Sequence, residues 1–274
     1  MWALLLASIA AQAPCPDCVP TLPAVVSAAS KSAQADQRVN LDLDDFRRRR
    51  AALDIAEALG ELPGVIARQR YNEAQDTQIQ IRGFGARSPF GVRGLRIDYD
   101  GIPATAADGQ SQIGHLDIAA GGQMSLLRGP FAALYGNGGG YLRIDSTRRR
   151  DNRLSTGFAA HGHRAGVALS GGEDLSFGLT SNYVQSDGVR AHSAAQRSLA
   201  SARLAWQISD SSDLLLNAHQ QEQPDSLDPQ GLTRLEFARN PFAASPAALA
   251  FNTRKSTRQA QIGARFRQEL GSSE

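Results

Sequence analysis

Residues 82–137 read RGFGARSPFGVRGLRIDYDGIPATAADGQSQIGHLDIAAGGQMSLLRGPFAALYGN, and glycine turns recur along the whole stretch. The turns are Arg82-Gly-Phe-Gly85, Asp100-Gly-Ile-Pro103, Asp108-Gly-Gln110, Arg128-Gly-Pro130 and Tyr135-Gly-Asn137. Glycine permits positive φ and close approach of two backbones, so such a series is typical of short strands folded into a loop-rich domain. The stretch sets up no pair of nucleophile and base, as an enzyme of that kind would need.

Short strands and a helix are predicted around these turns. Thr77–Arg82 and Leu95–Asp100 alternate polar and apolar residues, and Gln123–Leu127 is a third strand. Residues 54–62 carry apolar residues at helical spacing, and Pro63-Gly64 ends that helix. Strands and small helices in this order predict an α+β domain.

From residue 152 onward, alternating strands separated by turns take over. Six are predicted: Leu154–Gly162, Ala165–Gly171, Leu175–Gln185, Ser198–Ile208, Asp213–Gln221 and Ser256–Gln268. In the last strand Ala260, Ile262, Ala264 and Phe266 share one face, opposite Gln261, Gly263, Arg265 and Arg267. Strands between lipid and a polar lumen have this pattern, and connections that alternate between short and long fit the same interpretation. A soluble β-sandwich would also alternate.

Composition and the amino end limit the class of protein. The 29 basic and 27 acidic residues give a net charge of +2, which provides no broad field for nucleic acid. Arg47–Arg50 is expected on a solvated helix face or in a loop. Residues 1–13 resemble a secretory signal peptide, and Cys15 and Cys18 of an exported chain are expected to form a local disulfide. No run reaches the roughly 18 apolar residues of a membrane-spanning helix.

The motifs of the middle of the chain resemble the plug domain of TonB-dependent outer-membrane receptors. They are Leu62-Pro-Gly-Val65, Arg82-Gly-Phe-Gly85, Asp100-Gly-Ile-Pro103, Leu127-Arg-Gly-Pro130 and Leu134-Tyr-Gly-Asn137. Within that superfamily, Arg82-Gly-Phe-Gly-Ala-Arg-Ser88, Gly91-Val-Arg-Gly94 and Gly188-Val-Arg-Ala-His-Ser193 are similar to the branch that includes the receptor for pyrroloquinoline quinone.

The resemblance implies an α+β plug domain followed by antiparallel transmembrane β-strands of an incomplete 22-stranded-type β-barrel. The expected division is a signal peptide at 1–13, a periplasmic linker at 14–45, the plug at 46–150 and the first barrel strands at 151–274. It further implies import of a scarce nutrient across the outer membrane, without enzymatic chemistry or a cofactor. The partners would be the ligand, outer-membrane lipid and the periplasmic domain of TonB.

Specific residues are expected to carry these roles. The TonB box would be the β-prone segment Thr21, Leu22, Pro23, Ala24, Val25 and Val26, which can add as a strand to its partner; a disordered linker is the alternative. By the resemblance, Arg82 and Arg128 would pair with carboxylates of the barrel. Ligand contacts are expected in the apical plug loops, from Arg87, Ser88, Arg93, Asp108 and Gln110.

Alternatives stay open at this point. Six strands are too few to close a barrel in lipid, so the chain is expected to be an amino-terminal fragment or a truncated, non-functional receptor. A soluble periplasmic module built on a plug-like domain is a second possibility. His161 and His163 lie two residues apart and could begin a metal site, but no third ligand accompanies them.

Overall fold

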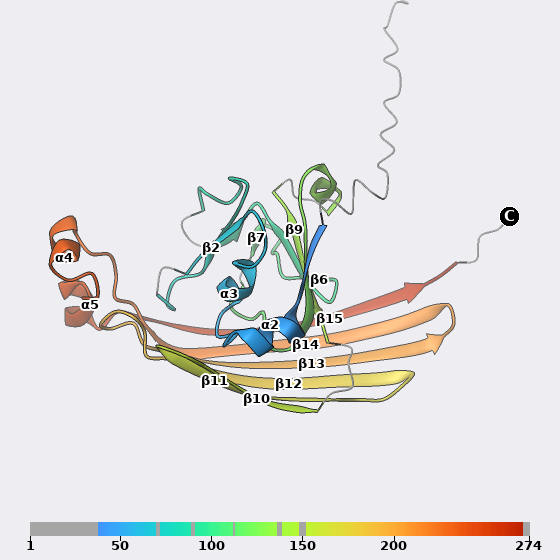
Figure 1. Ribbon diagram of the computed structural model, residues 1–274. Helices are drawn as coiled ribbons and strands as arrows, with labels where there is room; N and C mark the ends of the chain where they lie inside the picture. Colours follow the sequence, from blue (N-terminus) through green and yellow to red (C-terminus); the bar gives the residue numbers. More distant parts are fainter. Residues whose placement is uncertain are drawn as a thin grey trace, which may run out of the picture.

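A small α+β domain lies against one face of a long, gently curved sheet of six strands (Figure 1). This computed structural model describes residues 38–69, 72–88, 91–111, 113–135, 139–147 and 152–270. The predicted signal peptide, both cysteines and the predicted TonB box lie outside the described residues.

The main sheet of the α+β domain has five strands in the order β1-β8-β9-β5-β6. Their bounds are β1 Arg38–Asp42, β5 Arg96–Tyr99, β6 Ile102–Pro103, β8 Gly121–Leu127 and β9 Tyr141–Ser146. β5 and β9 are parallel, and the other pairs are antiparallel. Two smaller antiparallel pairs are β2 (Val65–Arg68) with β3 (Gln78–Ile81), and β4 (Val92–Arg93) with β7 (Gln110–Ser111).

Two short helices and a 3₁₀ turn, η1 (Pro130–Tyr135), complete the domain. α2 (Leu43–Arg49) begins at Asp42, whose carboxylate accepts hydrogen bonds from the backbone N–H groups of Asp44 and Asp45 at 2.8 and 3.0 Å. α3 (Ile55–Leu59) has a capping box formed by Asp54 and Glu57. The predicted helix over 54–62 is therefore real but shorter.

One residue of the arginine run departs from the expected solvated position. Arg47 lies largely buried and donates to the carbonyl of Ile118 at 2.9 Å and to that of Gly121, besides pairing with Asp44. Arg49 and Arg50 do lie on the surface, where they pair with Glu61. The sequence of four arginines could not indicate that Arg47 is buried, because the carbonyls that accept its hydrogen bonds belong to Ile118 and Gly121, more than 70 residues later.

The core of the domain is formed where the helices meet the sheet. Its most deeply buried side chains are Leu43, Phe46, Leu59, Ile79, Ile81, Leu95, Ile97, Tyr99, Met124, Leu126 and Leu142. Gly85, at φ +83°, shows why the loops need glycine, since a Cβ there would lie 2.3 Å from the carbonyl oxygen of Ile79. The turn at Gly85 thus packs closely against the backbone of β3.

The second body is an antiparallel meander in which each strand pairs with the next. Its strands are β10 Arg153–Ala159, β11 Gly162–Gly171, β12 Leu175–Ser186, β13 Ala195–Ser209, β14 Ser212–Leu227 and β15 Arg254–Gln268. The predicted number of strands is confirmed, and the bounds change. Ala160 and His161 form a turn that was expected to be strand. β14 runs six residues past Gln221, because a register shift between Gln223 and Ser226 accommodates Pro224.

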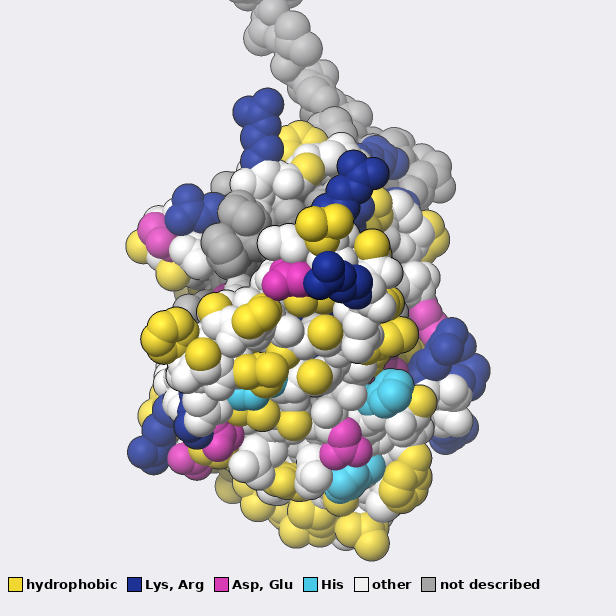
Figure 2. Space-filling view, turned by 90° about the vertical axis from the view of Figure 1, so that its left-hand side faces the viewer, with side chains coloured by type: hydrophobic (Ala, Val, Ile, Leu, Met, Phe, Trp, Pro, Cys, Tyr) yellow, Lys and Arg dark blue, Asp and Glu magenta, His cyan; other side chains and the backbone are white. Residues whose placement is uncertain are grey.

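The two faces of this sheet differ in chemistry. The face away from the α+β domain bears exposed apolar side chains: Leu154, Phe158, Val167, Leu169, Leu175, Phe177, Leu179, Leu204, Trp206, Leu216, Ile262 and Phe266. Figure 2 views the molecule from the end that carries α4 (Arg234–Arg239) and α5 (Pro246–Phe251), and hydrophobic side chains gather along its lower edge. The described residues contain no helix long and apolar enough to cross a membrane.

Candidate functional site

The predicted ligand residues lie in the loops around β4 and β7. Arg93 and Gln110 are paired across this two-stranded ladder, and Arg93 Nη2 donates to Gln110 Oε1 at 3.3 Å. The carboxylate of Asp108 accepts from the backbone N–H of Gln110 at 2.9 Å. The structure therefore brings Arg93, Asp108 and Gln110 together, with the side chains of Arg93 and Asp108 exposed.

The other two predicted residues, Arg87 and Ser88, occupy the preceding loop. Arg87 is exposed, whereas Ser88 is buried and its hydroxyl donates to the carbonyl of Gly91 at 3.1 Å. Gln78, on β3, stabilises this loop by two hydrogen bonds. Its Nε2 donates to the carbonyl of Ser88 at 2.9 Å and to that of Ala86 at 3.2 Å. The Ser88 hydroxyl thus supports the loop from inside, while Arg87 is free to reach outward.

Arg82 and Arg128 lie within the α+β domain and make no ion pair with any carboxylate of the described residues. Arg82 is exposed at the end of β3 with φ +49°. Arg128 Nη1 donates to the carbonyl of Pro63 at 2.6 Å. Their expected pairing with strand carboxylates stays a prediction.

Two arginines of the sheet contact the α+β domain, which is the reverse of the expected direction from plug arginine to strand carboxylate. Arg164 Nε, from β11, donates to the carbonyl of Ala51 at 3.2 Å, and Arg197 Nη2, from β13, donates to that of Leu53 at 2.6 Å. Arg197 also lies 3.7 Å from the carboxylate of Asp54. The segment between these carbonyls turns at Ala52, whose φ of +55° is uncommon for a residue with a side chain. We call Ala51–Asp54 with its two arginines the clamp.

Glycines of the sheet make room for the clamp and for a neighbouring polar contact. A Cβ on Gly157 would lie 2.3 Å from the carbonyl oxygen of Ala51, and one on Gly166 would lie 1.9 Å from Oδ1 of Asn182. Asn182 Nδ2 donates to Asp117 Oδ2 at 2.6 Å, joining β12 to the α+β domain. Burial raises the pKa of Asp117. The hydrogen bonds from the Ala119 N–H and from Asn182 act in the opposite direction, because they stabilise the ionised carboxylate.

A further contact lies at the Asp100-Gly101 turn. Arg265 Nη1, from β15, donates to the carbonyl of Asp100 at 3.3 Å, and Gln261 Nε2 donates to that of Pro103 at 2.6 Å. The carboxylate of Asp100 accepts from the backbone N–H and the hydroxyl of Ser146 at 2.9 and 3.0 Å. Burial raises the pKa of Asp100 despite these bonds. Backbone carbonyls of the α+β domain are thus the recurrent acceptors for the sheet.

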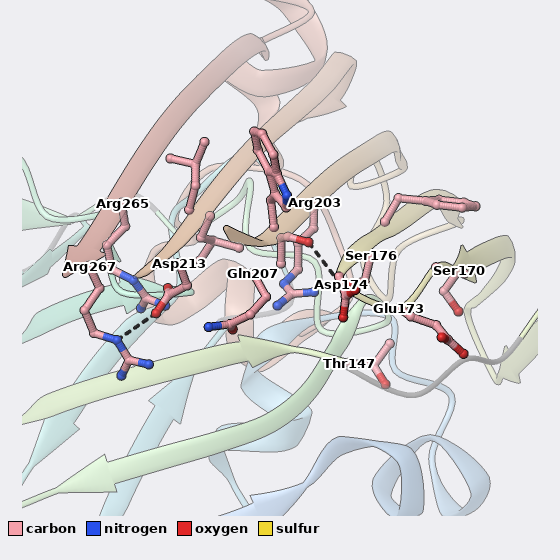
Figure 3. A pocket seen from close by; sticks show the side chains of 17 residues that line it. Thr147, Ser170, Glu173, Asp174, Ser176, Arg203, Gln207, Asp213, Arg265 and Arg267 are labelled. Atoms are coloured by element: carbon pink, nitrogen blue, oxygen red, sulfur yellow. Dashed lines mark hydrogen bonds and ion pairs between the residues drawn. The ribbon is translucent and has the colours of Figure 1, made fainter. Parts of the chain in front are cut away.

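Two cavities lie along the same face of the sheet. The larger, about 390 Å³, opens beside the short turns and is shown in Figure 3. Its charged lining is Arg203, Arg265, Arg267, Glu173, Asp174 and Asp213. Arg267 Nε lies 2.7 Å from Asp213 Oδ1. Three cations face three carboxylates here, so the cavity has no net charge with which to select an anion.

The smaller cavity, about 80 Å³, is lined by Asp54, Glu73, Arg197 and Gln221 among others. The pKa of Glu73 is raised from 4.5 to about 7, first by burial and second by the negative charge of Asp54, while the charge of Arg197 opposes the shift. Because Glu73 and the clamp share this cavity, the ionisation of Glu73 bears on the stability of the clamp.

The long connections at the other end of the sheet form one unit. Arg190, in the connection between β12 and β13, donates to the carbonyls of Gln230 at 2.8 Å, Ala243 at 2.9 Å and Pro229 at 3.4 Å. An open pocket of about 740 Å³ beside α4 has an apolar lining that includes Val189, Leu232, Phe237, Pro241 and Phe242. Exposed aromatic side chains therefore border this end of the molecule.

Neither histidine of the sequence-predicted pair belongs to a cluster of ligands. His161 lies in the turn after β10, and His163 lies on β11. The part of the chain that the structure describes contains no group of three or more His, Cys, Asp or Glu side chains that could hold a metal ion.

The sequence interpretation missed the two clamp arginines and the neighbouring Asn182. Asn182 lies inside the predicted strand Leu175–Gln185, whereas Arg164 and Arg197 each lie one residue before the predicted starts of their strands, at Ala165 and Ser198. In the structure all three lie within β11, β12 and β13. Their polar character was the available signal. The main-chain carbonyls that accept from the two arginines leave no trace in the sequence, and the pairing of Asn182 with Asp117 joins residues 65 positions apart.

Residues 30–141 match the family model described as TonB-dependent Receptor Plug Domain. The predicted presence of a plug domain is thereby confirmed, while its predicted bounds of 46–150 stay a prediction. The α+β domain is called the plug domain below.

Solved structures share the fold of both bodies. The ferric enterobactin receptor PfeA of Pseudomonas aeruginosa in complex with BCV-L6 is 17% identical, with a TM-score of 0.61 over 87% of this chain and 39% of that one. The siderophore receptor PirA of Acinetobacter baumannii is 23% identical, with a TM-score of 0.54 over 69% of this chain and 32% of that one. PirA of Pseudomonas aeruginosa is 24% identical, with a TM-score of 0.52 over 71% of this chain and 35% of that one. The chain thus spans between about a third and two fifths of their length.

Proposed function

We propose that this chain acts as a TonB-dependent outer-membrane receptor that takes up a scarce nutrient past its plug domain. The match over residues 30–141 and the fold shared with solved siderophore receptors support this function. No covalent chemistry is required of the chain in this role.

The observation that carries the proposal is the two-faced sheet. One face presents a band of exposed apolar side chains, whereas the opposite face binds the plug domain through Arg164, Asn182, Arg197 and Arg265. A sheet that is apolar outside and polar inside suits contact with lipid on one side and with a plug on the other. The same arrangement supports an outer-membrane location.

Energy for transport would arrive through residues 21–26 as the TonB box. An extended segment of this kind can add as an edge strand to a partner, and main-chain hydrogen bonds then supply the affinity. A pull on this segment would act on β1, which is an edge strand of the plug sheet and pairs only with β8 among the described strands.

For the ligand we propose a small anionic quinone of the pyrroloquinoline quinone type. The motifs at 82–88, 91–94 and 188–193 that resemble that receptor branch support this choice. Arg87, in the loop after β3, and Arg93, on β4, are both exposed on the plug domain, and a planar guanidinium suits carboxylates of such a ligand. A siderophore is the alternative, since the solved structures named above are siderophore receptors.

Cell fractionation tests the location. The full chain, expressed with its own amino end in a Gram-negative host, is expected in the outer-membrane fraction and in detergent extracts of it. Recovery as a monodisperse protein in the soluble periplasmic fraction would instead support a plug-like binding module and would overturn the receptor proposal.

Calorimetry tests the ligand. Titration of pyrroloquinoline quinone into the purified chain in detergent is expected to release heat, and Arg93→Ala is expected to weaken binding about 10-fold, as the loss of one charge-assisted contact predicts. Arg258→Ala, an exposed position on β15, is the matched control and should bind as the parent does. Absence of heat with the quinone together with binding of a ferric siderophore would refute the quinone assignment and leave the receptor proposal standing.

A further inference from the structure

The connection between β14 and β15 is closed at its base by Asp228 and Thr253. Asp228 N–H donates to the carbonyl of Thr253 at 2.9 Å, and the Thr253 hydroxyl donates back to the carbonyl of Asp228 at 2.8 Å. His192 Nε2, from the neighbouring connection, lies 3.0 Å from the same Thr253 carbonyl. The base is therefore a fixed point, to which α4 and α5 are attached. We call residues 228–253 the outer loop.

The side chain of Asp228 extends from the outer loop to the plug domain and accepts hydrogen bonds there. Oδ1 accepts from Asn72 Nδ2 at 2.8 Å and from the backbone N–H of Gln230 at 2.9 Å, and Oδ2 accepts from Gln75 Nε2 at 3.0 Å. Burial on its own would raise the pKa of Asp228, but these bonds and the charge of Arg190 outweigh it and lower the pKa. One ionised carboxylate thus joins two segments that are more than 150 residues apart in the chain.

The plug segment that Asp228 binds, residues 72–76, is held by the sheet at two more points. Gln223 Nε2, on β14, donates to the carbonyl of Glu73 at 2.9 Å, and Lys255 Nζ, on β15, lies 3.3 Å from Asp76 Oδ1. The side chain of Asn72 also folds the segment, because its Oδ1 accepts from the N–H of Ala74 at 3.0 Å. Asn72 is therefore occupied on both sides, by its own turn and by Asp228.

From this segment the chain runs directly into β3 and to a candidate ligand loop. Gln78, two residues after Asp76, is 4% exposed and donates to the carbonyls of Ala86 and Ser88. The loop that it holds carries Arg87. The base of the outer loop is therefore linked to the plug loop at 83–88 by two groups of hydrogen bonds, at residues 72–75 and at Gln78, which the short covalent segment 76–77 connects.

We propose that Asp228 is a positioning residue that couples the outer loop to the plug loop 83–88 through Asn72, Gln75 and Gln78. The coupling lets a change in the outer loop shift the loop that carries Arg87, and its use in uptake rests on the proposed function. Charge-assisted hydrogen bonds are among the strongest available for such a contact, and Asp228 accepts two of them from the plug domain. Coupling of this kind acts equally in both directions.

Hydrogen exchange on the purified full chain in detergent, without ligand, tests the coupling independently of the proposed function. Asp228→Asn replaces an acceptor oxygen by a donor and is expected to speed exchange of residues 72–76 and 83–88 about 10-fold, the effect of losing one charge-assisted hydrogen bond. Protection in β10–β15 should stay unchanged, which shows that the variant folds. Asp225→Asn is the matched control. Asp225 lies three residues before Asp228 in the chain, and its side chain forms a half-exposed ion pair with Arg254.

The reciprocal variant is made from the plug side. Asn72→Ala is expected to speed exchange at the base of the outer loop, residues 227–230 and 252–254, because the coupling is symmetric. The proposal is overturned if Asp228→Asn loosens the outer loop while residues 83–88 exchange as in the parent, or if Asn72→Ala changes only the plug domain. Either result would leave the receptor function untouched, since no ligand enters the measurement.

Discussion

Replacement of Arg197 by methionine gives the most direct test of how the plug domain is held. Arg197 donates to the carbonyl of Leu53 at 2.6 Å and lies 3.7 Å from the carboxylate of Asp54, and both charged side chains are largely shielded from solvent. Methionine keeps much of the apolar stem and removes the guanidinium, so the change isolates the polar contacts from packing.

The magnitude follows from these contacts. A hydrogen bond from a charged group contributes about 1.5–3 kcal/mol, and breaking a buried ion pair costs about 3–5 kcal/mol. Asp54 keeps the hydrogen bond from the N–H of Ala56 at 2.7 Å, so the expected loss is at the lower end, about 3 kcal/mol. Arg197→Lys keeps the positive charge but lacks the planar guanidinium with its several N–H donors, so we expect about half of the stability loss of Arg197→Met.

Native-state proteolysis measures this loss of stability locally, at the segment next to the clamp. Trypsin cleaves after Arg49 or Arg50, next to the clamp, when that segment opens, and about 3 kcal/mol corresponds to cleavage roughly 100-fold faster. Arg258→Met, on the exposed face of β15, is the control and should be cleaved near the clamp at the parent rate. Equal cleavage rates for Arg197→Met and the control would refute the clamp as the attachment of the plug domain.

Three further changes test the remaining contacts. Because the pKa of Glu73 is raised to about 7 in the folded protein, the free energy of unfolding should fall by up to about 3 kcal/mol as the pH rises from 4.5 to 7. In urea titrations Glu73→Gln should lack this pH dependence and should be more stable than the parent protein at about pH 8. Gly166→Ala places a Cβ against Asn182, which should break the bond to Asp117, cost about 2–4 kcal/mol and speed hydrogen exchange around residue 117; unchanged exchange would contradict the close approach. Leu179→Arg, on the apolar face, should cost about 2–4 kcal/mol in folding titrations in lipid vesicles, and a neutral result would argue against lipid contact there.

Local patterns predicted the elements that form locally. The alternation at 256–268 gave both the strand and its two faces, because side chains of a strand alternate whatever lies beside them. The helix at 54–62 was recognised by spacing, although it ends sooner. β1 and α2 were not identified, since β1 is stabilised by pairing with β8, more than 80 residues later, and α2 by burial of Leu43 and Phe46 against the sheet.

The sequence alone determined the glycine turns, the succession of the six long strands along the chain and the two-faced character of their sheet, because turn geometry and alternation are properties of neighbouring residues. The tertiary structure alone decided how the two bodies are joined. Arg164, Arg197 and Arg265 bind carbonyl groups, and every residue of a chain presents such a group, so composition and spacing cannot identify the acceptor. Likewise Asp228 acquires its role only when folding brings it to Asn72 and Gln75.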